Sequence, residues 1–389
     1  MAFRRRGNRK ASTTLPGCRP SPSNGLPVVA SGVPSLDNLL GGGLHVGSCI
    51  AVEEDEFGSY ARILMNLFAA EGVVSGHSLY VASASVQPAS ILDHLPGLAN
   101  SSTNTSAATA TVQTSGATSD TTAGSTAMGS IREEEDDDTS ADSLKIAWRY
   151  EKQATVANSS GTQPNRFSHT FDLGHKLDIP SSTTCGTFDG LVQPCSSKYT
   201  KLLQALDQFV EEHSLQAGSP NVLRLCLHCI GSPLWTECDD NDPLSSSGLL
   251  QFFHVLQARL RRWSAVALVT IPSHLWNGTP LAHRVRQLVD YAVHVESFAG
   301  SSKQQNPLYK DYHGLFHICK LPCWNSLAPI PLDSTDWAFK LRRKNFSIDK
   351  LHLPPDLSET ASRTQEDPVK PNKAAAAPGG RGHGRSLDF

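Results

Sequence analysis

The residues best suited to chemistry lie in one short loop, which runs from Glu53 to Tyr60 and leads into a helical pattern over 59–70. A strand, a six-residue loop and a helix form the layout of the phosphate-binding motif G-x-x-x-x-G-K-[ST]. Aligned with that motif, Glu53 replaces the first glycine and Gly58 retains the second. Ser59 replaces the lysine and Tyr60 replaces the serine or threonine. Gly58, Ser59 and Tyr60 are therefore the candidate residues of a vestigial nucleotide site.

The loop lacks the cation on which this chemistry depends. In a working loop the lysine neutralises the β- and γ-phosphates, and the hydroxyl binds Mg²⁺. Here four carboxylates at 53–56 would repel a triphosphate, and no lysine lies between Lys10 and Lys145. Neither of two apolar strand patterns, 222–230 and 265–271, ends in the aspartate that would hold Mg²⁺. The sequence predicts no catalytic residues, no intrinsic ATPase activity and no cofactor bound by this chain itself; a displaced catalytic lysine is the alternative.

Two cysteines, Cys226 and Cys229, flank His228 with a spacing that invites a zinc site. In an extended strand, residues three apart point to opposite faces, so the two sulfur atoms cannot reach one metal ion. The chain also lacks the metal-binding pattern H-E-x-x-H and the nucleophile pattern G-x-S-x-G. We therefore predict neither a metal site nor hydrolase chemistry.

Two groups of basic residues are candidates for contacts with other molecules. The group best placed to contact phosphate consists of Lys340, Arg342, Arg343 and Lys344. A solvated edge of a strand or helix explains these residues equally well. The second group, Arg284 and Arg286, faces solvent if the apolar residues of a predicted helix over 281–289 point inward. These arginines are candidates for a subunit interface, with ordinary surface charge as the alternative.

Strand and helix patterns alternate along the chain and predict how these residues are positioned. Strand patterns occur at 49–52, 77–82, 144–150, 222–230, 265–271, 291–295 and 314–321. Helical patterns occur at 59–70, 89–95, 199–210, 249–263 and 281–289. This alternation predicts an α/β fold with a twisted, mostly parallel sheet and helices on both faces.

Composition divides the chain into one domain with flanking segments. Residues 1–27 are basic and rich in Pro, Gly and Ser, which predicts a disordered basic N-terminal arm. The domain is predicted at 28–355, and the Pro-, Gly- and Ala-rich residues 356–389 predict a disordered tail. Residues 99–142 combine Ser, Thr and Ala with an acidic run and predict a disordered insertion within the domain.

Charge and cysteine content narrow the class of protein. The 389 residues carry a net charge of −3, which gives no overall signature of nucleic-acid binding. Nine cysteines are an odd number at irregular spacings, which favours reduced thiols. Because the sequence shows neither a signal peptide nor an 18-residue apolar run, we expect a soluble intracellular protein without membrane contacts.

The segment Ser31–Leu44 resembles the segment before the P-loop in RecA/RadA/KaiC-like ATPases. More closely, the chain resembles the Elongator protein 4 family, whose members are RecA-like and lack an intact Walker A motif; this chain lacks an intact Walker B motif as well. The stretches that carry this resemblance are Lys145–Tyr150, Gly231–Trp235, Asn306–Leu315, Leu351–Leu357 and Leu387–Phe389. Of these, Asn306–Leu315 is specific, whereas the glycine-rich segment alone indicates only the superfamily. The resemblance implies a RecA-like P-loop-NTPase fold with a degenerate nucleotide site.

The resemblance also implies a function that composition does not. It implies a non-catalytic subunit of the Elongator complex, in a hetero-hexameric ring with subunits 5 and 6 that docks on the larger subunits 1, 2 and 3. It further implies that the ring binds tRNA, that ATP can occupy ring interfaces, and that the complex modifies the wobble uridine. It places the protein in the cytoplasm with a nuclear pool. The alternatives are an active RecA/KaiC-like ATPase and a nuclear scaffold without RNA contact.

Overall fold

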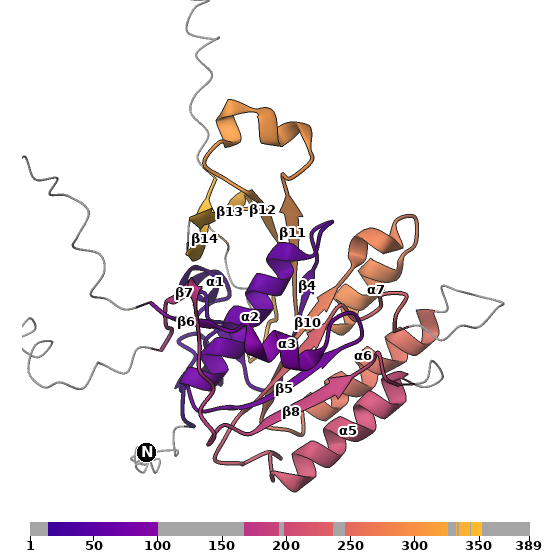
Figure 1. Cartoon of the computed structure of the whole chain (residues 1–389). Helices are drawn as coiled ribbons and strands as arrows, with labels where there is room; N and C mark the ends of the chain where they lie inside the picture. The colour runs from indigo at the N-terminus through magenta and orange to yellow at the C-terminus, as the bar shows by residue number, and fades with distance from the viewer. Residues whose placement is uncertain are drawn as a thin grey trace, which may run out of the picture. The chain divides into compact units, whose positions relative to one another are not determined.

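The computed structural model of the chain is built around a nine-stranded sheet (Figure 1). The structure describes residues 15–99, 167–193, 198–235, 246–325, 332, 334–342 and 344–351. The chain divides into two units, 1–351 and 352–389, and every described residue belongs to the first unit. None of the described helices is long and apolar enough to cross a lipid bilayer.

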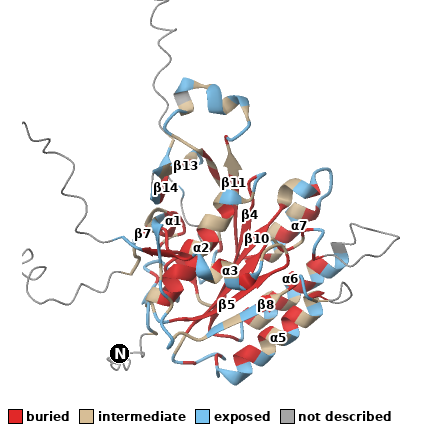
Figure 2. Ribbon diagram, in the orientation of Figure 1, coloured by how far each residue is buried: buried red, intermediate tan, exposed pale blue. Residues whose placement is uncertain are grey.

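Six parallel strands form the larger part of this sheet, in the spatial order β11-β4-β10-β9-β5-β8. They are β4 (Cys49–Glu53), β5 (Ser78–Ser83), β8 (Cys185–Asp189), β9 (Leu223–His228), β10 (Ala265–Ile271) and β11 (Tyr291–Ser297). The central strands are mostly apolar and are buried along their length, as expected for strands covered on both faces (Figure 2). The predicted α/β class with a mostly parallel sheet is thereby confirmed.

Antiparallel strands extend the sheet beyond β11. They are β12 (Gly314–Lys320), β13 (Trp337–Arg342) and β14 (Asn345–Lys350). Two small sheets complete the strands: β1 (Cys18–Pro20), β2 (Pro27–Val29) and β3 (Leu44–His45) form one, and β6 (Pro96–Leu98) and β7 (Phe171–Lys176) form the other. Sequence patterns predicted β12 but not β13, β14 or the small sheets, whose strands are short or carry charged residues.

Helices cover both faces of the main sheet, as predicted. One face packs against α1 (Pro34–Leu39), α2 (Ser59–Val74) and α3 (Pro88–Asp93). The other packs against α5 (Lys198–Glu212), α6 (Ser246–Leu260) and α7 (Leu281–Leu288). Short 3₁₀ turns occur at η1 (Ser273–Trp276), η2 (Ser302–Gln305) and η3 (Pro307–Tyr309). Alternation along β4 separates the two cores, because Ile50 and Val52 contact the first group of helices whereas Cys49 and Ala51 contact the second.

Two segments differ from the sequence prediction. The arm predicted at 1–27 is wrong for its described part, because Cys18 lies in β1 and the Arg19 guanidinium donates to the carbonyl of Gly42 at 2.9 Å. Apolar Leu15 and Cys18 pack against the core, which outweighs the local Pro and Gly content. The second difference is β8, which pairs with β5 although its residues gave no strand pattern. Nearly all of the predicted insertion at 99–142 and the predicted strand at 144–150 lie outside the described residues.

An arginine, Arg224, is fully buried as the second residue of β9. Its Nε donates to Nδ1 of His77 at 3.0 Å, and its Nη1 donates to the carbonyls of Ala30 and Phe68, each at 2.9 Å. The guanidinium carbon lies 4.6 Å from the centre of the Phe68 ring. One side chain thus joins the segment before α1, the helix α2 and the entry to β5.

Helix α2 makes room for this arginine at Gly72. A Cβ atom at Gly72 would lie 2.5 Å from Cδ of Arg224, whose side chain is fully buried. We expect Gly72→Ala to lower the melting temperature, because overpacking costs about 1–3 kcal/mol whereas the helix gains at most about 1 kcal/mol from alanine. Gly248→Ala in α6 is the matched control, since a Cβ there meets nothing closer than 4.0 Å. If both variants melt alike, the contact is not tight.

Candidate functional site

The carboxyl ends of the parallel strands meet at one edge of the main sheet, which we call the carboxyl edge. Open α/β sheets bind their ligands at this edge, so it is the first place to look for a site. The loop between β4 and α2 lies there, together with Cys229 after β9 and Thr270 near the end of β10. The structure therefore brings the predicted loop and the ends of both candidate strands to one edge.

The turn between β4 and α2 depends on Gly58 and Asp55. Gly58 has φ of 64°, in the left-handed region that glycine adopts without steric cost, and its N–H donates to the carbonyl of Asp55 at 2.8 Å. The buried Asp55 carboxylate accepts the backbone N–H groups of Ser59 at 3.2 Å, Tyr60 at 3.0 Å and Ala61 at 3.4 Å. These donors begin α2 and would otherwise lack an intrahelical partner. The sequence analysis missed this cap because Asp55 lies four residues before the helix.

The last residue of β4, Glu53, is buried and paired with Arg286 from α7. Arg286 donates to both carboxylate oxygens, through Nε to Oε1 and through Nη2 to Oε2 at 2.6 Å. Nδ1 of His294 on β11 lies 3.3 Å from Oε2. Burial opposes ionisation of Glu53, but Arg286 and His294 outweigh it and hold the pKa of this carboxyl at about 2. Glu53 is therefore ionised and fully compensated near neutral pH.

This pairing corrects the prediction that Arg286 faces solvent. Arg286 does not face solvent freely, because the buried carboxylate of Glu53 draws it back across the end of β4. Arg284 is exposed, as predicted. Of the four loop carboxylates, Glu53, Glu54 and Asp55 are buried and Glu56 is exposed. An interface role for Arg284 and Arg286 stays a prediction.

The neighbouring carboxyl group, that of Glu54, points into the protein beneath the loop. It is 5% exposed, and its Oε2 accepts a weak hydrogen bond from Sγ of Cys229 at 3.5 Å. The Thr270 hydroxyl accepts the Cys229 N–H at 2.7 Å and so fixes this contact. Burial raises the pKa of Glu54 although Thr270 and Cys229 oppose the shift. Cys229 thus donates a hydrogen bond to Glu54, whereas Cys226 packs in the core between the sheet and helices α1, α2 and α3, which we call the first core.

The two substituted positions of the motif have different surroundings. Ser59, which stands in place of the lysine, is exposed. Tyr60, in place of the magnesium-binding hydroxyl, is half-buried, and its ring centre lies 4.6 Å from that of Phe339 on β13. Tyr60 therefore joins the start of α2 to the antiparallel part of the sheet. Nucleotide binding by Gly58, Ser59 and Tyr60 stays a prediction.

A serine and a histidine also meet at the carboxyl edge. The Ser85 hydroxyl lies 2.9 Å from Nδ1 of the buried His228. Burial and the charge of Arg62 lower the pKa of His228 to about 4, which makes the imidazole a weak base near neutral pH. The described residues also hold no cluster of three or more His, Cys, Asp or Glu side chains that could bind a metal ion. The pair is best explained as part of the packing between β5 and β9.

The predicted phosphate-contacting residues that the structure describes lie on the β13–β14 hairpin. Lys340 pairs with Asp349 at 3.2 Å, and Lys344 pairs with Asp172 of β7 at 3.2 Å. Arg342 is exposed, while Arg343 lies outside the described residues. Both lysines are therefore partly neutralised, and contact with tRNA stays a prediction for all four residues.

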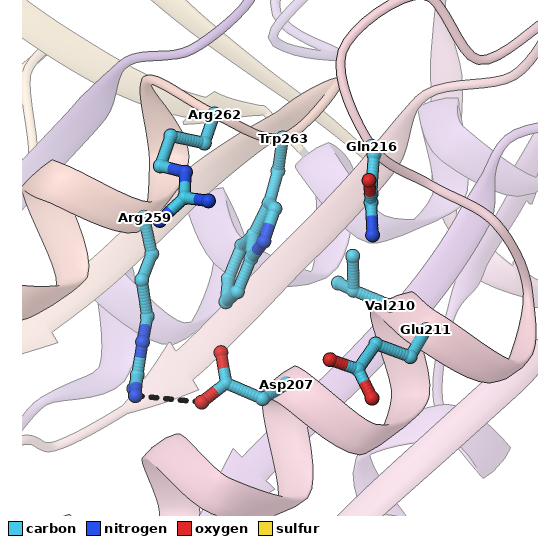
Figure 3. A pocket seen from close by; sticks show the side chains of 7 residues that line it. All are labelled: Asp207, Val210, Glu211, Gln216, Arg259, Arg262 and Trp263. Carbon is cyan, nitrogen blue, oxygen red and sulfur yellow. Dashed lines mark ion pairs between the residues drawn. The ribbon is translucent and has the colours of Figure 1, made fainter.

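A separate pocket of about 320 Å³ lies between α5 and the end of α6 (Figure 3). Its walls are formed by Asp207, Val210, Glu211, Gln216, Arg259, Arg262 and Trp263. Arg259 and Asp207 pair at 2.6 Å, and the two acidic and two basic residues balance in charge. The pocket contains none of the predicted site residues, and its balanced charge favours no class of ligand.

The fold and the carboxyl edge define an α/β protein whose strand–loop–helix turn is closed by its own carboxylates. The chain matches the family described as PAXNEB protein over residues 11–389. Elongator complex protein 4 from Danio rerio is 36% identical over 386 residues, which cover 94% of this chain and 91% of that protein. The protein of that name from Homo sapiens is 36% identical over 413 residues, covering 97% and 91%. The one from Saccharomyces cerevisiae is 24% identical over 379 residues, covering 90% and 78%.

The chain belongs to the PAXNEB family and to the family of these Elongator complex protein 4 relatives. This membership confirms the family that the sequence motifs indicated. The family match extends over residues 11–389, which is nearly the whole chain.

Proposed function

We propose that this chain is a non-catalytic subunit of an Elongator complex, with a RecA-like fold and a degenerate P-loop. The observation that carries the proposal is the family match over residues 11–389, together with similarity to Elongator complex protein 4 along at least 90% of the chain. The nine-stranded sheet with helices on both faces is consistent with a RecA-like fold.

The chemistry of the loop supports the absence of catalysis. A phosphoryl-transfer site needs a cation to neutralise the transferred phosphoryl group and a bound metal ion. Here Ser59 replaces the lysine, and the carboxylates of Glu53, Glu54 and Asp55 are occupied within the protein. Under the proposal, any ATP in the assembly would lie at ring interfaces and would depend on residues of other subunits.

Exposed apolar side chains at the carboxyl edge support a contact with a neighbouring subunit. They follow the ends of four parallel strands, and they are Phe57, Leu191, Val192, Leu234 and Leu275. Phe57 is 63% exposed and Val192 is 77% exposed, which is costly for side chains of this size. A RecA-like ring joins unlike faces head to tail, and three different chains allow such a ring to close. We propose that subunits 5 and 6 are the ring neighbours and that this edge meets one of them.

The remaining parts of the proposed function concern the whole assembly. The ring of six would dock on the larger subunits 1, 2 and 3 and bind tRNA, so that the complex modifies the wobble uridine. In this chain the exposed Arg342 on β13 is the best-placed described cation of the predicted tRNA-binding group. The assembly would act in the cytoplasm, with a nuclear pool.

Affinity purification of the tagged full-length chain from its own cells tests this proposal. We expect the two other small ring subunits to co-purify, followed by the larger Elongator subunits at lower yield. A variant carrying both Phe57→Asp and Leu275→Asp is expected to recover at least fivefold less of one small subunit, because it places charges in an apolar contact.

Leu98→Asp is the matched control, since Leu98 is exposed on β6 and not at the carboxyl edge. It should leave the yield of partners unchanged. A set of partners without the other two small subunits would refute the assignment itself. Equal loss in the control and the double variant would instead refute only the proposed interface.

A further inference from the structure

The beginning of α2 already holds an anion, and that anion belongs to the chain. Asp55 places one oxygen 3.2 Å from the N–H of Ser59 and the other 3.0 Å and 3.4 Å from the N–H groups of Tyr60 and Ala61. The carboxylate is buried, so these three hydrogen bonds are shielded from water. The negative charge also lies at the positive end of the helix dipole, where it is stabilising.

These three donors are the groups with which a helix N-terminus binds phosphate. An N–H that donates to Asp55 is not free to donate to a second anion. A second carboxylate lies close to the turn, because Oε2 of Glu54 is 3.6 Å from the position that a Cβ on Gly58 would occupy. Glu54 is 5% exposed, and its Oε1 has no hydrogen-bond partner within the part of the chain that the structure describes. A phosphate would therefore have to displace one carboxylate and approach another.

We propose that Asp55 is an internal ligand that takes the place of a bound phosphate and keeps the turn between β4 and α2 closed without nucleotide. This inference deepens the proposed function, because it rests on the view that the turn derives from a phosphate-binding loop. In a nucleotide-dependent loop, the ligand supplies the anion that orders the helix end. Here the sequence supplies it, so the shape of the carboxyl edge does not depend on nucleotide.

The ordered turn also positions groups on both sides of it. Tyr60 donates its N–H to Asp55 and packs its ring on Phe339 of β13. Glu53, two residues before Asp55, holds Arg286 of α7. Asp55 is thus a positioning residue for both flanks of the carboxyl edge, and its loss would loosen contacts beyond the loop.

Anion rescue of Asp55→Ala tests the inference with the full-length chain. We expect this variant to melt about 2–6 °C below wild type in sodium chloride, because three helix-end donors lose their acceptor. Inorganic phosphate at the same ionic strength should restore at least half of that loss, since it can occupy the freed donors. The melting temperature of the wild type should be the same in both salts, because its site is filled.

Asp55→Asn keeps one acceptor oxygen and provides a second variant that is expected to fold. It should lose less than Asp55→Ala and gain less from phosphate. The inference is overturned if phosphate stabilises wild type as much as the alanine variant, or if neither variant responds to phosphate. If Asp55→Ala does not fold, the comparison of wild type with Asp55→Asn decides by the same criteria. The test needs no partner protein, so its outcome is separate from that of the co-purification experiment.

Discussion

Replacing Arg286 with methionine is expected to lower the free energy of unfolding by about 3–5 kcal/mol, the usual cost of leaving a buried charge without its partner. Glu53 is 1% exposed, and Arg286 donates to both of its oxygens. Methionine retains much of the apolar stem but supplies no charge. His294, 3.3 Å away, cannot replace a bidentate guanidinium. Equilibrium unfolding in urea, followed by circular dichroism at pH 7.5, measures the loss.

The pH dependence of this loss identifies its cause. In wild type the pKa of Glu53 is held at about 2, below the ordinary value of 4.5. A depressed carboxyl pKa contributes stability above the unfolded value, and that stability disappears as the pH falls from about 4.5 towards 2. Without Arg286, Glu53 can relieve its burial only by taking up a proton. The deficit of Arg286→Met should therefore shrink between pH 7.5 and pH 4.

Two further variants separate charge from packing. Arg284→Met changes an exposed arginine on the same helix and is expected to alter stability by less than about 0.5 kcal/mol. Glu53→Gln combined with Arg286→Met removes both charges and should recover a large part of the loss. A deficit that is equal at pH 4 and pH 7.5, or a double variant no more stable than Arg286→Met, would contradict the explanation.

Periodicity was sufficient for the elements that are buried and regular. The apolar run at 265–271 is β10, and the helix predicted at 281–289 is α7 (Leu281–Leu288). β8 and β14 were missed because they are the edge strands of the main sheet, and edge strands expose half their residues and tolerate polar or small side chains. Such strands take their conformation from the neighbour with which they pair, and a local pattern does not contain that neighbour.

The site was harder to predict than the sheet, because its pairs are formed between distant parts of the chain. Glu53 and Arg286 are 233 residues apart in sequence, and only the parallel order of β4 and β11 brings α7 to the end of β4. The four acidic residues therefore looked like a repulsive cluster. The role of Asp55 could not be predicted from spacing alone, because its carboxylate reaches the helix N–H groups only when Gly58 adopts a left-handed conformation. Gly58 is the one motif residue that the sequence retains, and its role is to allow the left-handed backbone conformation of the turn.

The second large expected effect on stability comes from replacing Arg224. This substitution tests the core between the sheet and helices α1, α2 and α3, and not the carboxyl edge. Arg224→Met is expected to lower the free energy of unfolding by about 3–5 kcal/mol, because it removes a buried cation and three donated hydrogen bonds. The carbonyls of Ala30 and Phe68 would lose a donor within the core. Asp37 and Glu71, whose charges act on Arg224, would remain buried without this cation. Urea unfolding at pH 7.5 measures the loss, with exposed Arg262→Met as the control.

Acidification should reduce the stability loss of Arg224→Met, because the pKa values of two buried groups, Asp37 and His77, depend on their surroundings. Burial raises the pKa of Asp37 to about 6 in wild type, and removing a nearby cation raises it further. When the pKa of a carboxyl is raised by folding, the folded state binds a proton at a higher pH than the unfolded state does. Lowering the pH from about 7.5 to 5.5 therefore stabilises the folded variant relative to its unfolded state. Burial and the Arg224 charge lower the pKa of His77 to about 3. Without Arg224 that pKa rises, so the variant also loses less stability than wild type as unfolded His77 is protonated below about pH 6.5.

The effects of Asp37 and of His77 both reduce the stability loss of Arg224→Met as the pH falls, so the pH dependence tests whether these buried groups interact with Arg224. The difference between Arg224→Met and wild type should be largest at pH 7.5 and should fall steadily to pH 5.5. A deficit that stays constant would mean that lost packing, and not uncompensated charge, explains the effect. A deficit below about 1 kcal/mol would mean that the surroundings relax to admit water, so that Arg224 is not needed to hold α2 against β9. Arg224→Lys distinguishes the cases further, because it retains the charge but cannot donate to His77, Ala30 and Phe68 in the same planar geometry.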